Sequence, residues 1–242
     1  MKRLLTFLFA LVTLMTTASA QNKYDLNNDG EVNLADVTLL VNVILGRHEY
    51  VDLGLTSGTL WATTNIGADN PEEYGDYFAW GETEPKSDYS WATYKWCEGL
   101  KDTLKKYCQD STRGYNGFTD DLTELTDEDD AAYVHWGPQW RMPSKAQQDE
   151  LREECTWTWT QQNGVNGYKV VGTNGNSIFL PATGFFNGTS NSSTGSNGYY
   201  WSRSVYTDNQ HGAYDVGIDS GNVSWYGFNR FHGFSIRPVR VQ

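Results

Sequence analysis

The chain has 242 residues, a formal net charge of −12 at pH 7 and 14% aromatic residues, including ten Trp and fifteen Tyr. This length allows one good-sized domain plus a small module. No basic patch stands out in so acidic a chain, so nucleic acid is not an expected partner. Frequent glycines and many rings indicate short strands, many turns and exposed aromatic side chains.

Residues 1–20 have the pattern of a secretory signal peptide. Lys2 and Arg3 supply the positive start, an apolar run extends over residues 4–15, and Ala18-Ser19-Ala20 is a small-residue cleavage site. The apolar run is too short to span a bilayer comfortably, and no later segment is apolar enough to cross one. We therefore expect an exported protein, secreted or held at the cell surface, that is cut near Ala20.

Residues 21–48 contain a calcium loop of the EF-hand type, followed by the start of a helix. Counting from Asp25 as position 1, oxygen-bearing side chains fall at positions 1, 3, 5, 9 and 12, and glycine falls at position 6. Calcium takes several oxygen ligands around such a tight loop. The predicted ligands are Asp25, Asn27, Asp29, the carbonyl of Glu31, Asn33 and Asp36. The competing interpretation is a turn rich in Asp and Asn that caps a helix over residues 37–45.

Residues 49–242 show no break in composition and are predicted to form one α+β domain. "LGLTSGTLWATTNIG" predicts short strands, and the polar, acidic residues 82–130 predict long surface loops. "PSKAQQDELREEC" is the main predicted helix, because Ser144 and Gln147 form a capping-box pattern. "YKVVGTNGNSIFLP" predicts a hairpin around Asn174-Gly175.

The end of the chain predicts three or four short strands, with turns near Asp208-Asn209, Ser220-Gly221 and Phe231-His232. Its rings are mixed with short amides and acids, a composition that recognition surfaces use. The alternative is that half of these rings belong to the core, with Trp201 and Trp225 the first to be buried. The candidate ligand-binding residues are Tyr206, Asp208, Asn209, His211, Asp215, Tyr226, Phe228, Asn229, Phe231 and His232. Trp140 and Ile236 are placed in the core.

Five stretches resemble a secreted bacterial family, the Fib-succ major paralogous domain. They are "YVDLGLTSGTLWATTNIGA", "YGDYFAWGET", "DDAAYVHWGPQWRMPSKAQQDEL", "NGYYWSRSVY" and "SIRPVR". The "WRMPS" box and the closing "RPVR" are also similar to the wider C-type-lectin-like group, which includes the formylglycine-generating-enzyme fold. The resemblance covers nearly all of residues 49–242. It implies a compact α+β domain whose final strands and loops form a binding face.

The front module resembles a type I dockerin repeat, because Asp36 stands at position 12 and "VTLLVNVILG" follows it. A full dockerin has two such repeats, and this chain shows one. The resemblance implies an alternative function as a structural component docked on a cohesin-like scaffold. A single repeat argues against cohesin binding by itself.

The chain is predicted not to be an enzyme. Formylglycine-generating relatives use a pair of cysteines near the C-terminus, and this chain has none after Cys155. The four histidines are not at metal-ligand spacing, and no pair of carboxylates is singled out for glycoside hydrolysis. His135 is expected to be a packed or hydrogen-bonded structural residue, and "TDDLTELTDEDD" a solvated acidic loop with an N-capping Asp. The expected function is recognition or adhesion, with an extracellular protein or a carbohydrate as the ligand.

The three cysteines are an odd number for an exported chain, so at least one thiol stays unpaired. Cys97 and Cys108 are close enough in sequence to close a small loop, and alternatively Cys155 pairs with one of them. Members of the resembled family often have Cys where this chain has Thr64. That departure implies that Cys155 is the free thiol.

Overall fold

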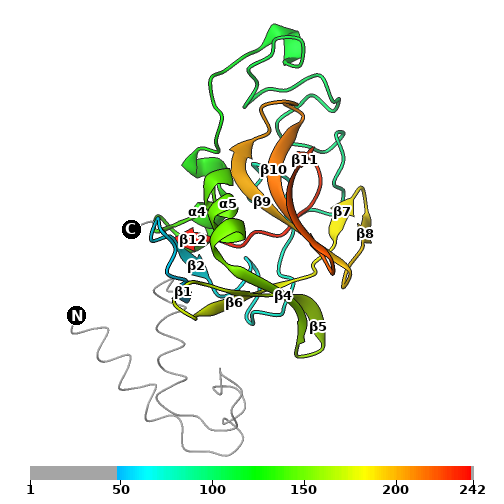
Figure 1. Cartoon of the computed structure of the whole chain (residues 1–242). Coiled ribbons are helices and arrows are strands. Elements are labelled where there is room, and N and C mark those ends of the chain that lie inside the picture. The colour runs from blue at the N-terminus through cyan, green and yellow to red at the C-terminus, as the bar shows by residue number, and fades with distance from the viewer. Residues whose placement is uncertain (1–47, 241–242) are drawn as a thin grey trace, which may run out of the picture. The chain divides into compact units, whose positions relative to one another are not determined.

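The computed structural model describes residues 48–240. The chain divides into two units, Met1–His48 and Glu49–Gln242, and every described helix and strand belongs to the second (Figure 1). The predicted signal peptide and the predicted calcium ligands from Asp25 to Asp36 lie outside the described residues. Both therefore stay predictions.

The described residues contain four small antiparallel sheets and two α-helices, which confirms the coarse prediction of many short strands and few helices. The first sheet joins the start of the domain to its end, because Val239 lies opposite both Trp61 and Arg141. Its strand order is β1-β2-β12-β3. The bounds are β1 (Tyr50–Asp52), β2 (Leu60–Ala62), β3 (Trp140–Arg141) and β12 (Val239–Arg240).

The second sheet, of order β4-β5-β6, is built from two consecutive hairpins. The predicted turn at Asn174-Gly175 is confirmed, and Gly175 has a φ of 87°, which glycine adopts without the steric penalty of other residues. A separate two-stranded ribbon follows. The bounds are β4 (Thr156–Gln162), β5 (Val165–Val171), β6 (Ser177–Pro181), β7 (Phe185–Asn187) and β8 (Ser190–Ser192).

The third sheet carries the C-terminal segment and consists of β9 (Asn197–Val205), β10 (Gly212–Asp219) and β11 (Asn222–Asn229). Its order is β11-β10-β9, so β10 is central and β11 is an edge strand (Figure 1). The predicted turns near residues 208–209 and 220–221 are confirmed as the links between these strands.

The main helix, α5 (Lys145–Glu154), begins where the sequence predicts it. The Ser144 hydroxyl accepts a hydrogen bond from the Gln147 N–H, and the Gln147 side chain accepts one from the Ser144 N–H. A shorter helix, α4 (Ala131–Trp136), is not among the predicted elements. The Asp130 carboxylate caps it by accepting from the N–H groups of Ala132 and Tyr133.

The acidic stretch before α4 is more buried than its composition suggests. Residues 82–130 are mostly loops, as predicted, with short 3₁₀ turns at η1 (Tyr115–Gly117) and η2 (Asp127–Asp129). Asp129 and Asp130, however, are buried, so the prediction of a solvated loop is wrong at its end. The N-capping Asp predicted for this stretch is confirmed, because Asp130 is the N-cap of α4. The reason for Asp129 is long-range pairing: its carboxylate accepts from the Lys106 Nζ and the Tyr107 hydroxyl, both at 2.7 Å.

Three of the predicted core residues are confirmed. Trp140, Ile236 and Trp201 are at most 2% exposed, and the Trp201 ring stacks on Phe234 with centroids 4.2 Å apart. The structural prediction for His135 is also confirmed, because its Nε2 lies 2.6 Å from the carbonyl oxygen of Thr83.

All three cysteines are free thiols, so the expectation of a single free thiol is wrong. Cys97 and Cys108 lie buried in one apolar cluster, with their sulfur atoms directed at backbone carbonyls of Trp91 and Asp110. Closeness in sequence therefore does not translate into a disulfide between them.

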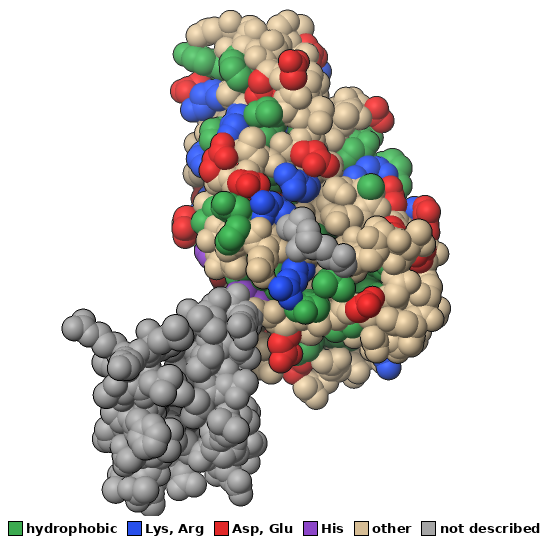
Figure 2. All heavy atoms as spheres, turned by 90° about the vertical axis from the view of Figure 1, so that its left-hand side faces the viewer, with side chains coloured by type: hydrophobic (Ala, Val, Ile, Leu, Met, Phe, Trp, Pro, Cys, Tyr) green, Lys and Arg blue, Asp and Glu red, His purple; other side chains and the backbone are tan. Residues whose placement is uncertain are grey.

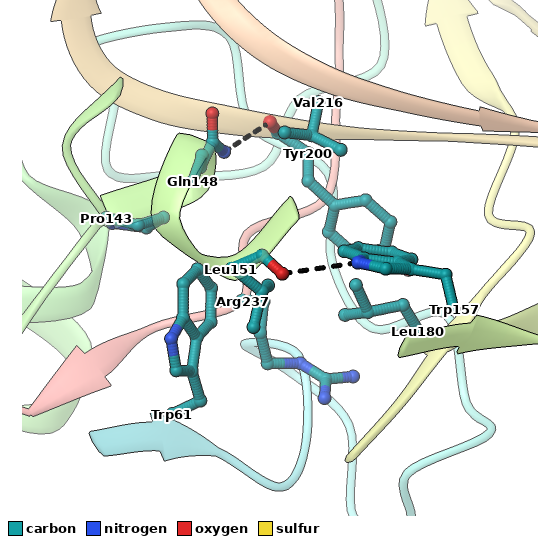
Figure 3. Close-up of a pocket in the computed structure, with 9 residues that line it drawn as sticks. All are labelled: Trp61, Pro143, Gln148, Leu151, Trp157, Leu180, Tyr200, Val216 and Arg237. Atoms are coloured by element: carbon teal, nitrogen blue, oxygen red, sulfur yellow. Dashed lines mark hydrogen bonds between the residues drawn. The ribbon is translucent and has the colours of Figure 1, made fainter. Parts of the chain in front are cut away.

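A second apolar cluster lies between α5 and the sheets and borders a small, partly open cavity of about 10 Å³ (Figure 3). A cavity of this size is just large enough to hold one water molecule. Among the residues that line this cavity, one polar atom in each of three side chains has no hydrogen-bond partner among the described residues: Trp61 Nε1, Gln148 Oε1 and Arg237 Nη2. Figure 3 shows the Arg237 guanidinium and the Gln148 amide pointing in different directions, so these groups do not converge on a ligand.

The charged surface is mixed on the face that Figure 2 shows, where Lys and Arg side chains lie among Asp and Glu. This face presents no basic patch, in keeping with the composition. Within residues 48–240, the helices are too short or too polar to cross a membrane.

Candidate recognition surface

The ten candidate ligand-binding residues all lie on β9–β11 or the loops beside them, but they differ in exposure. Asp208, Asn209 and Tyr226 are exposed, and Tyr206, Phe228 and Asn229 are partly buried. The remaining four are buried: His211, Asp215, Phe231 and His232. The prediction is therefore wrong for these four, which cannot form part of an open surface.

The two buried histidines, His211 and His232, are each held by hydrogen-bonding contacts. The Nε2 of His211 lies 2.7 Å from a carboxylate oxygen of Asp102, and its Nδ1 lies 3.0 Å from the side-chain oxygen of Asn209. The Nδ1 of His232 lies 3.0 Å from the carbonyl oxygen of Asn229. Burial lowers the pKa of both imidazoles, which favours their neutral forms.

Phe231 is buried because other rings surround it. Its centroid lies 5.1 Å from that of Trp91 and 4.2 Å from that of His232. Trp91 belongs to the long loop that precedes α4, so this packing depends on chain segments far apart in the sequence. Such aromatic pairs add to the free energy of unfolding beyond the area they bury.

Asp215 is completely buried in the central strand β10, opposite Trp201 on one side and Tyr226 on the other. Neither carboxylate oxygen has a hydrogen-bond partner among the described residues. Burial raises the pKa of Asp215 well above its usual value, because it disfavours the charged form, and the nearby backbone of Phe228 offsets this only in part. Asp215 therefore cannot serve as an exposed hydrogen-bonding group.

Three rings and one lysine lie in contact with one another beside the C-terminal strands, and we call them the ring row: Tyr206, Tyr214, Trp225 and Lys145. Tyr214 lies between the other two rings, with its centroid 5.0 Å from that of Tyr206 and 5.5 Å from that of Trp225. The Lys145 Nζ lies 4.9 Å from the Trp225 centroid, within the range of cation–π attraction. Trp225 remains 40% exposed.

Two glycines make room for the rings. A Cβ atom at Gly227 would lie 2.2 Å from the Tyr206 ring, and one at Gly217 would lie 2.7 Å from the Tyr226 ring. Real Cβ atoms do not approach other atoms so closely. Each ring therefore lies flat against the sheet only because the residue beneath it is glycine.

Tyr226 is 39% exposed on the opposite face of β11, since neighbouring residues of a strand point to opposite sides. Its hydroxyl accepts a hydrogen bond from the Asn222 amide at 3.1 Å. No residue of β11 is fully buried, and the sequence "NVSWYGFN" contains no charged residue and no proline. The edge strand thus presents a large ring on each face without the charges that commonly protect such edges.

Three members of the ring row are not among the predicted site residues. Trp225 is predicted to be buried, and the structure contradicts this, because Trp225 lies beside Lys145 at the first turn of α5 rather than under the helix. Tyr214 has a recognisable signal, since it occurs in the ring-rich terminal segment. Lys145 has no recognisable signal in the sequence, because the ring that it contacts, Trp225, lies far from it along the chain.

The described residues offer stacking and hydrogen bonding rather than an evident metal site. Within residues 48–240, no three His, Cys, Asp or Glu side chains are grouped so that they could hold a metal ion. The predicted calcium ligands lie outside this range. No family model, curated protein or solved structure matches this chain.

Proposed function

We propose that this protein is an exported, non-catalytic recognition protein that binds a surface protein or a glycan through its C-terminal strands. The observation that carries the proposal is the ring row, with Trp225 40% exposed on an uncharged edge strand. Exposed Trp and Tyr rings supply a large contact area at little cost in conformational entropy. They are also the residues on which binding energy concentrates at interfaces.

The polar residues beside the rings support the same proposal. Asp208 and Asn209 are exposed in the loop that follows Tyr206, where they can supply hydrogen bonds. The resemblance to the C-type-lectin-like group and to the Fib-succ family points to the same end of the domain. In this proposal the fold is lectin-like and the front module is an accessory calcium hand.

The proposal is tested by screening the labelled mature protein on glycan and surface-protein arrays, together with Trp225→Ala and the control Tyr115→Ala. Tyr115 is a second exposed ring, 44% exposed, outside the C-terminal strands. We expect hits that Trp225→Ala loses and Tyr115→Ala keeps. If Trp225→Ala still binds the same array ligands, the ring row is not the binding surface.

A further inference from the structure

We propose a second ligand site, on the β4–β5–β6 sheet, that takes a small sugar acid: a polyhydroxylated ring bearing a carboxylate. The site is a surface cavity of about 300 Å³, at the lower end of the size range of small-molecule pockets. Thr63, Pro71, Gln162, Lys169, Ser177 and Phe179 contribute to its lining. Its lining residues belong to β4, β5, β6 and the segment after β2, and none belongs to β9–β11 (Figure 1). The site is therefore independent of the proposed function.

The strand register brings the polar lining residues to one face of the sheet. Lys169 lies opposite Phe179, and Val171 opposite Ser177, in the β5–β6 pairing. Gln162 lies opposite Val165 in the β4–β5 pairing. Because directly opposed residues share a face and the side-chain period along a strand is two, Gln162, Lys169, Ser177 and Phe179 point to the same side.

Lys169 is the unusual member of this set. It is exposed, and its ammonium group forms neither an ion pair nor a hydrogen bond with any described residue. By contrast, other lysines of this acidic chain are neutralised: Lys86, Lys95, Lys105, Lys106 and Lys145 each lie within 4.0 Å of a carboxylate. An unpaired ammonium group at the rim of a cavity is the natural partner of a ligand carboxylate.

The other polar groups are suited to hydroxyls. The Gln162 amide is held in place because its Nε2 donates to the Glu72 carboxylate at 3.2 Å, which leaves its oxygen free to accept. The Ser177 hydroxyl has no hydrogen bond with another described residue, and the Thr63 hydroxyl has only a long one of 3.5 Å. Both hydroxyls can both donate and accept.

The apolar part of the lining completes the match. Pro71 and Phe179 supply carbon surface, against which the C–H face of a sugar ring packs. The lining exposes polar and apolar surface in nearly equal amounts, which suits a ligand that carries both hydroxyls and a carbon ring face. Two available hydroxyls, an oriented amide and a lysine without an ion pair among the described residues therefore favour a sugar acid over a neutral sugar.

The test is a titration of the ¹⁵N-labelled mature protein with sodium D-glucuronate, with D-glucose as the neutral probe. We expect saturable amide shifts around Lys169 and Ser177 with glucuronate, and none with glucose. Lys169→Gln should weaken glucuronate binding about tenfold or more, because a hydrogen bond to a charged group is lost. Lys101→Gln is the matched control, an exposed lysine without an ion pair among the described residues, and should bind within about twofold of the parent protein.

Three results would overturn the site: no saturable shift at these strands, equal binding of glucose, or the same loss of affinity in Lys101→Gln as in Lys169→Gln. A thermal melt of each variant shows that the domain is folded. Because Trp225 and Tyr226 play no part in this cavity, their alanine variants should leave glucuronate binding unchanged.

Discussion

The carboxyl group of Asp215 is buried without a hydrogen-bond partner among the described residues. We therefore expect the stability of the domain to depend on pH. The pKa of Asp215 in the folded state is raised above that in the unfolded chain, so the folded state binds the proton more tightly. The free energy of unfolding therefore falls as pH rises from about 4, the unfolded pKa, toward the folded pKa. The loss is about 1.4 kcal/mol for each unit by which the pKa is raised.

Asp215→Asn removes this titration while keeping the shape of the side chain. We expect the variant to be more stable than the parent protein at pH 7, with the difference disappearing toward pH 4. Thermal melts between pH 4 and pH 8 measure it, with the exposed loop residue Asp208→Asn as the control. A variant less stable than the parent at pH 7 would show that the carboxylate is ionised and held by a partner.

Gly227, which lies beneath the Tyr206 ring, gives a second prediction about stability. Gly227→Ala places a methyl group against the Tyr206 ring and should destabilise the domain by about 1–3 kcal/mol, as overpacking does. Gly221→Ala, in the turn between β10 and β11, is the matched control, because its nearest neighbouring atom lies 3.7 Å from the added carbon. Equal melting temperatures for the two variants would mean that Tyr206 moves away at no cost.

At the scale of elements, α4 depends on Asp130. Its carboxylate accepts from the N–H groups of Ala132 and Tyr133 and, at 3.0 Å, from that of Met142 beside β3. Asp130→Ala removes the cap and leaves buried N–H groups unpaired, so we expect a loss of about 2 kcal/mol or more. Asp121→Ala, an exposed acid of the same stretch, should stay within about 0.5 kcal/mol of the parent protein in denaturant melts. Similar losses in both variants would contradict the special role of Asp130.

The elements that the sequence predicts well are those fixed by neighbouring residues. The capping box of Ser144 and Gln147 and the turn at Asn174-Gly175 each depend on partners within a few positions, so their patterns can be recognised directly. The site is predicted less well, because exposure depends on distant segments. His211 is buried against Asp102, 109 positions away, and Trp225 is exposed because of where α5 begins. Neither of these long-range contacts can be recognised from the residues next to His211 or Trp225 in the sequence.

At the scale of the whole molecule, the predicted calcium loop can be tested separately from ligand recognition by the C-terminal strands. If Asp25, Asn27, Asp29, Glu31, Asn33 and Asp36 bind calcium, the ion should protect the mature N-terminus from limited proteolysis. Asp25→Ala should abolish that protection and leave residues 49–242 intact. Mass spectrometry of the digests, with and without chelator, measures both. An identical digestion pattern under the two conditions would contradict the site.

The central claim is that the outer rings of the C-terminal strands serve binding while the inner rings serve folding. Phe231, which is 9% exposed, belongs with the inner group, and Trp225 and Tyr226 form the outer one. The most direct measurement pairs a thermal melt with binding to an array ligand for Trp225→Ala, Tyr226→Ala and Trp140→Ala. We predict that the first two lose binding, at a cost of about 2 kcal/mol or more in affinity, and melt near the parent temperature. Trp140→Ala should lose about 3 kcal/mol or more of stability. If Trp225→Ala and Tyr226→Ala instead unfold the domain as severely as Trp140→Ala and bind normally when folded, the outer rings are structural and the claim is wrong.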